Sequence, residues 1–148
     1  MKKKDNFYFS KVGSLLAVRK NSVLRKAYEN LFNRSPQVIF RDQHVAGYEM
    51  RERGTLENFF SSLDLGKIEN LCFELRSEID DFCRDHPNKL ARNRRYTFFL
   101  CKEGGSITVI RICVNDYSEL IIDEFPINYG LEWSPLHWVV VVLPPEKK

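Results

Sequence analysis

The chain has 148 residues, of which 43% are hydrophobic and 29% are charged, a composition that is ordinary for a globular protein. No apolar run approaches the length of a membrane span, and no apolar segment follows the basic residues at the N-terminus, so we expect neither membrane insertion nor a signal peptide. The net charge of +3 hides a gradient, because residues 1–100 carry 19 Lys and Arg against 13 Asp and Glu, whereas residues 101–148 carry 4 against 7. The first part of the chain is therefore basic and the last part acidic.

A lysine-rich arm over residues 1–12 opens the chain, and residues 13–95 are predicted to be mainly helical. Apolar residues recur near helical spacing over residues 14–33 and predict a helix there, which Pro36 ends. The apolar stripe of this helix consists of Leu16, Leu24, Ala27, Leu31 and Phe32. Its basic residues lie mostly off the stripe, so they form either a solvated face or a phosphate-contacting one.

A short strand is expected over residues 37–40, where it would join the sheet at an edge. Residues 41–54 are polar and charged without any period, which predicts a loop. A loop of this length inside one domain is either functional or mobile. Thr55 is expected to cap a short helix over residues 56–65, which stops at Gly66.

The clearest helical pattern covers residues 68–83. Apolar side chains recur at i, i+3, i+4 and i+7, which is typical of a helix with one buried face. They are Ile68, Leu71, Cys72, Leu75, Ile79, Phe82 and Cys83. We expect this helix to cover one face of the sheet, so that Leu75→Asp or Ile79→Asp would abolish folding.

Four strands are predicted between residues 96 and 143, because β-branched and aromatic residues concentrate there. The runs are 96–103, 106–114, 118–125 and 136–143. Gly104 and Gly105 predict a tight hairpin between the first two, since glycine adopts positive φ without a Cβ clash. The fourth run is apolar on both faces, which predicts a central strand or one beneath a helix.

These elements predict one α+β domain over residues 1–148. Its sheet would be antiparallel and have four or five strands, arranged as a meander over residues 96–143. The helices that precede the sheet in the chain would pack on one of its faces.

Motifs for catalysis or for metal binding are absent from the sequence. It has no glycine-rich nucleotide loop, no H-E-x-x-H, no G-x-S-x-G and no paired cysteine spacing. We therefore expect no cofactor and no metal, and ordinary structural roles for His44, His86 and His137. The four cysteines are expected to be reduced packing residues, which favours a cytoplasmic location. They are Cys72, Cys83, Cys101 and Cys113.

The densest basic cluster lies in residues 86–95, directly before the first predicted strand. Long cations are rarely buried unpaired, so this connection and residues 41–54 should both lie at the surface. If the two stretches meet, they form one positive surface that attracts phosphate or an acidic partner, and if they lie apart, each is a solvated loop. The candidate binding residues are His44, Arg51, Arg53, Lys89, Arg92, Arg94, Arg95 and Tyr96.

The first functional hypothesis is a small cytoplasmic interaction or regulatory protein without a catalytic site. Its partner would be acidic or phosphate-bearing, and would be either a protein or a nucleic acid. The basic residues would supply one docking surface. Acidic side chains of the last third would supply another, namely Glu119, Asp123, Glu124 and Glu132.

Helices ahead of an antiparallel sheet, with basic residues at the join, also resemble in architecture the small mRNA-cleaving toxins of toxin–antitoxin pairs. This resemblance implies a metal-independent ribonuclease. The residues around its phosphate would be Arg94, Arg95, Tyr96, His44 and His86. The chain and its final β segment are both longer than in those toxins. Nucleic-acid binding without cleavage is a third alternative.

Overall fold

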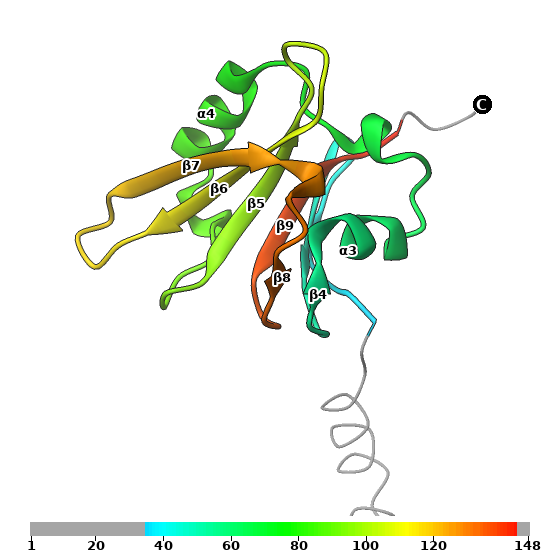
Figure 1. Cartoon of the computed structure of the whole chain (residues 1–148). Coiled ribbons are helices and arrows are strands. Elements are labelled where there is room, and N and C mark those ends of the chain that lie inside the picture. The colour runs from blue at the N-terminus through cyan, green and yellow to red at the C-terminus, as the bar shows by residue number, and fades with distance from the viewer. Residues whose placement is uncertain (1–34, 145–148) are drawn as a thin grey trace, which may run out of the picture. The chain divides into compact units, whose positions relative to one another are not determined.

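The computed structural model describes residues 35–144, so the predicted arm and the helix over residues 14–33 lie outside the described residues. Within that range the chain forms a six-stranded sheet and a two-stranded sheet (Figure 1). The large sheet contains, in spatial order, β2 (Gln37–Arg41), β3 (Val45–Glu49), β9 (Trp138–Val142), β5 (Tyr96–Cys101), β6 (Thr108–Val114) and β7 (Leu120–Pro126). The other elements are β4 (Gly54–Thr55), α3 (Leu56–Ser62), η1 (Ile68–Leu71), α4 (Arg76–Asp85), η2 (Pro87–Lys89), η3 (Ile127–Tyr129) and β8 (Glu132–Trp133).

The α+β class and the mainly antiparallel sheet are confirmed, but the predicted meander is wrong in its last step. Strands β5, β6 and β7 do follow one another as antiparallel neighbours, and Gly104 and Gly105 turn the first hairpin with φ of 93° and 92°. Strand β9 instead pairs with β5 in parallel, on the side away from β6. A parallel neighbour requires a long crossover, which the segment between β5 and β9, with β6, β7, η3 and β8, supplies. As predicted, β9 is central, because it lies between β3 and β5.

The predicted strand count of four or five is also wrong, because residues 41–54 contain an internal strand. Strand β3 pairs with β2 on one side and with β9 on the other. Its middle residues are buried on both faces, so no alternation marks it in the sequence. Gly47 suits the packing here, since a Cβ at this position would lie 2.2 Å from the Phe40 ring, which would have to shift.

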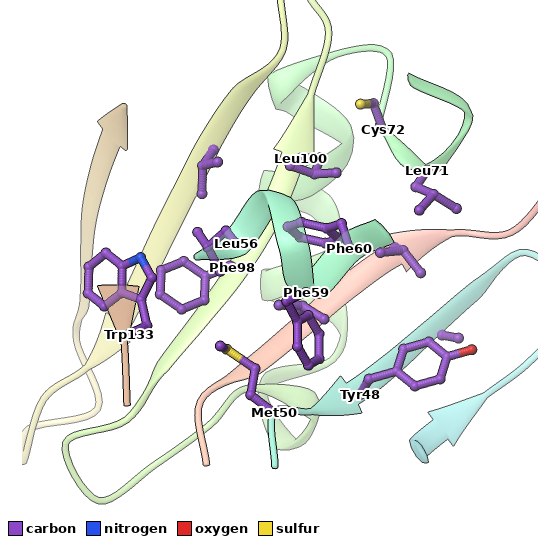
Figure 2. Packing of buried hydrophobic residues seen from close by; sticks show 14 of the residues in the cluster. Tyr48, Met50, Leu56, Phe59, Phe60, Leu71, Cys72, Phe98, Leu100 and Trp133 are labelled. Atoms are coloured by element: carbon purple, nitrogen blue, oxygen red, sulfur yellow. The ribbon is translucent and has the colours of Figure 1, made fainter. Parts of the chain in front are cut away.

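Side chains of the large sheet alternate between two cores. The core on the α3 face contains Leu56, Phe59 and Phe60 of the helix, packed over Phe98 and Leu100 of β5 (Figure 2). The core on the α4 face lies on the other side of the same strands and contains Ile79, Phe82, Cys83, Phe99, Cys101, Ile110, Ile112 and Val140. The prediction that the helices pack on one face is therefore wrong for the described residues, because α3 and α4 cover opposite faces (Figure 1).

The predicted helix over residues 68–83 is divided at the sheet. Phe73 forms a bridge with the end of β5, since its N–H donates to the carbonyl of Leu100 at 2.8 Å. The chain thereby crosses from one core to the other, so Leu71 lies in the α3-face core and Ile79 in the α4-face core. Leu75 is only the N-cap of α4 and is 48% exposed, so the prediction that Leu75→Asp abolishes folding is wrong in its premise.

Candidate functional site

Exposed apolar side chains concentrate on β7, one of the two terminal strands of the large sheet. Leu120, Ile121 and Ile122 are consecutive in this strand and all are exposed. Further exposed apolar residues occur in the connections on either side, namely Tyr117, Tyr129 and Leu131. In a strand, consecutive side chains point to opposite faces, so this edge presents apolar surface on both faces of the sheet.

The register of β7 shows which of its backbone groups face away from β6. The N–H of Asn115 donates to the Glu119 carbonyl at 3.0 Å, and the N–H of Ile127 donates to the Ile107 carbonyl at 3.3 Å. Both pairs continue the β6–β7 register, in which hydrogen-bonded and non-hydrogen-bonded pairs alternate. The odd-numbered residues of β7 therefore bond to β6. The N–H and C=O groups at the free edge belong to Leu120, Ile122 and Glu124.

A groove of about 240 Å³ lies between α4 and strands β6 and β7, on the α4 face of the sheet. Side chains of β6 and β7 form its apolar floor, namely Ile110, Ile112, Leu120 and Ile122. Helix α4 forms its mixed wall with Arg76, Ser77, Ile79, Asp80 and Cys83. The exposed apolar side chains of the β7 edge therefore continue directly into a concave surface.

Arg76 and Glu124 join α4 to β7 at one end of the groove. The Arg76 Nη2 lies 2.6 Å from Glu124 Oε1, and its Nε lies 3.2 Å from each carboxylate oxygen. The hydrogen bonds from Arg76 lower the pKa of Glu124. Both side chains remain partly exposed, so the pair positions the strand against the helix without closing the groove.

The groove contains no activated nucleophile. Burial, with a smaller contribution from Asp80, raises the pKa of Cys83 to about 12, so its thiol stays protonated at neutral pH. All four cysteines are free, and burial raises the pKa of Cys72 to about 11. Between residues 35 and 144, no group of His, Cys, Asp and Glu side chains is arranged to hold a metal ion.

His137 and Ser134 form a pair that sequence reasoning did not single out. The backbone N–H of Tyr96 donates to His137 Nδ1 at 3.0 Å, so the proton of the neutral ring lies on Nε2. That nitrogen lies 3.3 Å from Ser134 Oγ and donates to it, so it cannot accept the serine proton. Burial, and then the positive charges of Arg95 and Arg111, lower the pKa of His137. The pair therefore fixes the start of β9 to β5 and does not activate a nucleophile.

Arg51 and Arg95 are candidate cations that a shared carboxylate brings together. They approach the same carboxylate, with Arg51 Nη1 at 2.9 Å from Glu49 and Arg95 Nη1 at 4.0 Å. The indole N–H of Trp138 also donates to Glu49, at 3.1 Å. The two positive charges are thus partly neutralised at the end of β3.

The other candidate residues have different surroundings. His44 precedes β3, and Lys89 Nζ lies 4.8 Å from the ring centroid of Phe40 on the neighbouring strand. Both are near Asp42, whose pKa is lowered mainly by backbone hydrogen bonds from His44 and Val45, with a smaller contribution from Lys89. This group lies at the start of β3, about 13 Å of strand from Glu49.

The remaining cations are separated further. Arg53 pairs with Glu132 at 3.1 Å, and Arg92 reaches the Ser118 hydroxyl at 3.5 Å. Arg94 is exposed in a turn with a left-handed φ of 67° and forms no ion pair with another described residue. Residues 35–144 carry 12 Lys and Arg against 17 Asp and Glu, a net charge of −5, whereas residues 1–34 carry 9 against 2. The cationic excess of the chain therefore lies outside the described residues.

The residues expected for a ribonuclease do not converge. Tyr96 belongs to the α3 face, where Arg111 lies over its ring at 4.5 Å. His86 packs against Phe82, in the core on the α4 face, with 5.0 Å between the ring centroids. The sheet thus separates the rings of Tyr96 and His86.

Sequence reasoning missed the groove because it depends on distant partners. Three consecutive apolar residues in β7 suit a strand covered on both faces as well as an exposed one. Only the position of β7 at the end of the sheet, with α4 beside it, separates these cases.

No described helix is long and apolar enough to cross a membrane. Comparisons with protein-family models, with curated proteins and with solved structures gave no significant match.

Proposed function

We propose that this chain carries a non-catalytic protein-interaction domain whose binding surface is the groove between α4 and β7. One observation carries the proposal: three consecutive apolar residues are exposed on a free sheet edge that borders an apolar groove. Exposed apolar surface beside a concavity is typical of interaction sites on soluble proteins.

Burial of this surface would supply the binding free energy. Each square ångström of apolar surface removed from water contributes about 25 cal/mol, and well-packed central anchors dominate interfaces. Leu120 and Ile122 are the natural anchors, because they line the groove and retain exposed area. The absence of an activated nucleophile in the groove agrees with binding rather than catalysis.

The charge distribution favours a protein over a phosphate-bearing partner for residues 35–144. The net charge of −5 repels a polyanion, and Glu49 partly neutralises Arg51 and Arg95. The partner predicted from the basic residues was acidic or phosphate-bearing. The geometry instead supports one that buries apolar side chains.

Photo-crosslinking from the groove tests the proposal. The full chain, with benzoylphenylalanine replacing Leu120, is expected to form a discrete adduct in cells of the source organism. The same group in place of Val38, on the opposite edge strand β2, should not form that adduct. The adduct identifies a partner whose affinity can then be measured with purified proteins.

A matched pair of substitutions decides whether the groove binds that partner. Ile122→Asp should weaken binding by at least about tenfold, whereas Val38→Asp should leave it unchanged. Both residues are 51% exposed, so the variants differ in which edge they alter. An unchanged Kd for Ile122→Asp would contradict the proposal. Cleavage of total RNA in EDTA that disappears in Arg94→Ala/Arg95→Ala would favour the ribonuclease alternative.

A further inference from the structure

We infer that the groove binds an extended segment of a partner protein, which adds to β7 as a seventh strand of the large sheet. The segment carries apolar side chains over the groove and Lys or Arg side chains on the opposite face of the sheet. This inference rests on the proposed function, because it names the occupant of the same groove. Backbone geometry, side-chain alternation and charge each constrain that occupant.

The backbone of β7 offers a regular ladder. Leu120, Ile122 and Glu124 direct their N–H and C=O groups away from β6, and the β6–β7 register is continuous along the strand. An extended peptide can pair with these groups through main-chain hydrogen bonds, as in other cases of strand addition. Pro126 has the same parity but no N–H, so the row of outward donors ends before it.

Side-chain alternation determines what the added strand places over the groove. Residues directly opposite each other in paired strands project to the same face. Leu120 and Ile122 line the groove, so the partner residues opposite them would also point into it. Because the floor of the groove is apolar, these two partner residues are apolar.

Charge determines the intervening positions. Asp123 lies on the other face of β7, and Glu119, directly before the strand, continues the same register through the hydrogen bond from the Asn115 N–H to its carbonyl. Arg111 pairs with Asp123, but that carboxylate is still half exposed. Glu119 is exposed, and one of its carboxylate oxygens accepts from Asn115 Nδ2 at 2.9 Å. Lys or Arg opposite these two acids would be complementary, and the net charge of −5 on residues 35–144 agrees with such a partner.

The same acids disfavour a second copy of this chain as the occupant. In a twofold pairing with Ile121 on the axis, Leu120 lies opposite the partner's Ile122 and Glu119 lies opposite the partner's Asp123. Like charges directly opposite each other in a sheet are destabilising. This register, which matches the apolar residues, therefore opposes the acidic ones. With Ile122 on the axis instead, Ile121 would lie opposite Asp123 and Leu120 opposite Glu124, whereas a basic partner strand can match both kinds of residue.

Amide exchange measured by NMR on the full chain tests the inference directly. The probe is a soluble seven-residue peptide that alternates lysine with valine, and the control peptide alternates glutamate with valine. In the free protein, the amides of Leu120, Ile122 and Glu124 should exchange quickly, whereas those of Ile121 and Asp123 should be protected by β6. The lysine peptide should slow exchange at the first three amides by at least tenfold, and the glutamate peptide should not.

Two variants separate backbone pairing from side-chain contact. Ile122→Pro removes an outward N–H and leaves the β6 ladder intact, whereas Ile122→Ala removes only side-chain volume. Fluorescence anisotropy of the labelled lysine peptide should show at least tenfold weaker binding for the proline variant than for the alanine variant. If the proline variant does not fold, the exchange measurement on the wild-type chain still decides the outcome.

The inference and the proposed function fail in distinguishable ways. Peptide binding that shifts the methyl signals of Ile110 and Ile122, but leaves the three edge amides unprotected, keeps the groove and overturns strand addition. Equal binding of the two peptides overturns the basic partner. A self-dimer that Ile122→Asp dissociates overturns the foreign partner. Absence of any peptide effect overturns the inference, and the proposed function is then decided by crosslinking alone.

Discussion

The two terminal strands of the large sheet have similar apolar content but differ in how they meet solvent. Strand β2 is short, its register with β3 shifts between Val38 and Phe40, and the Phe40 ring stacks on Phe82 of α4 with 6.0 Å between centroids. Strand β7 has a continuous register and three consecutive exposed apolar residues. Irregular pairing is one way in which natural sheets protect an edge. Accessibility of an edge therefore depends on its register and on the elements beside it rather than on its hydrophobicity.

The largest expected effect is loss of folding, which would abolish both edges at once because α4 packs against both. Ile79 is 2% exposed in the α4-face core, and an unpaired carboxylate there costs several kcal/mol, so Ile79→Asp should abolish cooperative unfolding. Circular dichroism during heating measures this. Leu75→Asp, at the exposed N-cap of the same helix, is the control and should be at least as stable as the wild type, because Asp is favoured over Leu at an N-cap. A soluble, cooperatively melting Ile79→Asp protein contradicts the placement of α4.

The second prediction concerns the pH dependence of the stability of the whole sheet, which His137 holds at its centre. His137 joins two central strands, and its pKa is lowered in the folded protein, so the unfolded chain binds the proton more readily. The free energy of unfolding of the whole sheet, both edges included, should therefore fall as pH drops below about 6.5. His137→Asn should be less stable at neutral pH but should lose this dependence between about pH 7 and 5.5. Urea unfolding at each pH measures it, and an unchanged slope in the variant argues against His137 as the cause.

The third prediction sharpens the comparison at β7 itself. Glu119→Gln with Asp123→Asn removes the acidic side chains that oppose self-pairing of this edge, so the full chain should associate more strongly with itself. Light scattering over a concentration series measures this association. Arg41→Gln, which removes a charge from β2, is the control and should have little effect because the register of that edge is irregular. Equal scattering by the two variants would show that the edges do not differ in this way.

The smallest expected effect concerns the protection of β2. Lys89 lies over the Phe40 ring, and a cation–π contact at a surface position contributes about 0.5 kcal/mol. Lys89→Ala should lower the free energy of unfolding by about that amount, and Lys89→Arg should preserve it. Denaturant unfolding measures both variants. A larger loss in Lys89→Ala would assign Lys89 a greater part in holding this edge.

The elements that the sequence predicts well are those determined by neighbouring residues. Gly104 and Gly105 specify their hairpin through local backbone freedom, and Thr55 caps α3 by accepting from the N–H of Asn58 at 3.2 Å. The apolar run of β9 predicts a central strand because it must be covered on both faces. In each case the physical cause lies within a few residues of the element.

The missed features depend on contacts between distant segments. The pattern over residues 68–83 continues through Phe73, but its backbone bonds to β5 and interrupts the helix. Strand β3 shows no alternation because β2, β9 and both cores surround it. The basic residues were visible in the sequence, whereas their partners Glu49 and Glu132 lie in other segments of the fold. The candidate groove likewise combines α4 with β7, which neither segment indicates alone.

The central position of β9 has a consequence for synthesis on the ribosome. Residues of β3 and β5 emerge well before Trp138–Val142, yet β9 is the strand that pairs with both. Until then the nascent chain presents two unsatisfied ladders, and the strand that joins them contains four consecutive valines. Parallel and long-range pairing is slow to form, and such intermediates are prone to aggregate. The β5–β6–β7 hairpins can form during elongation, so β7 would be an ordered edge while the middle of the sheet is still incomplete.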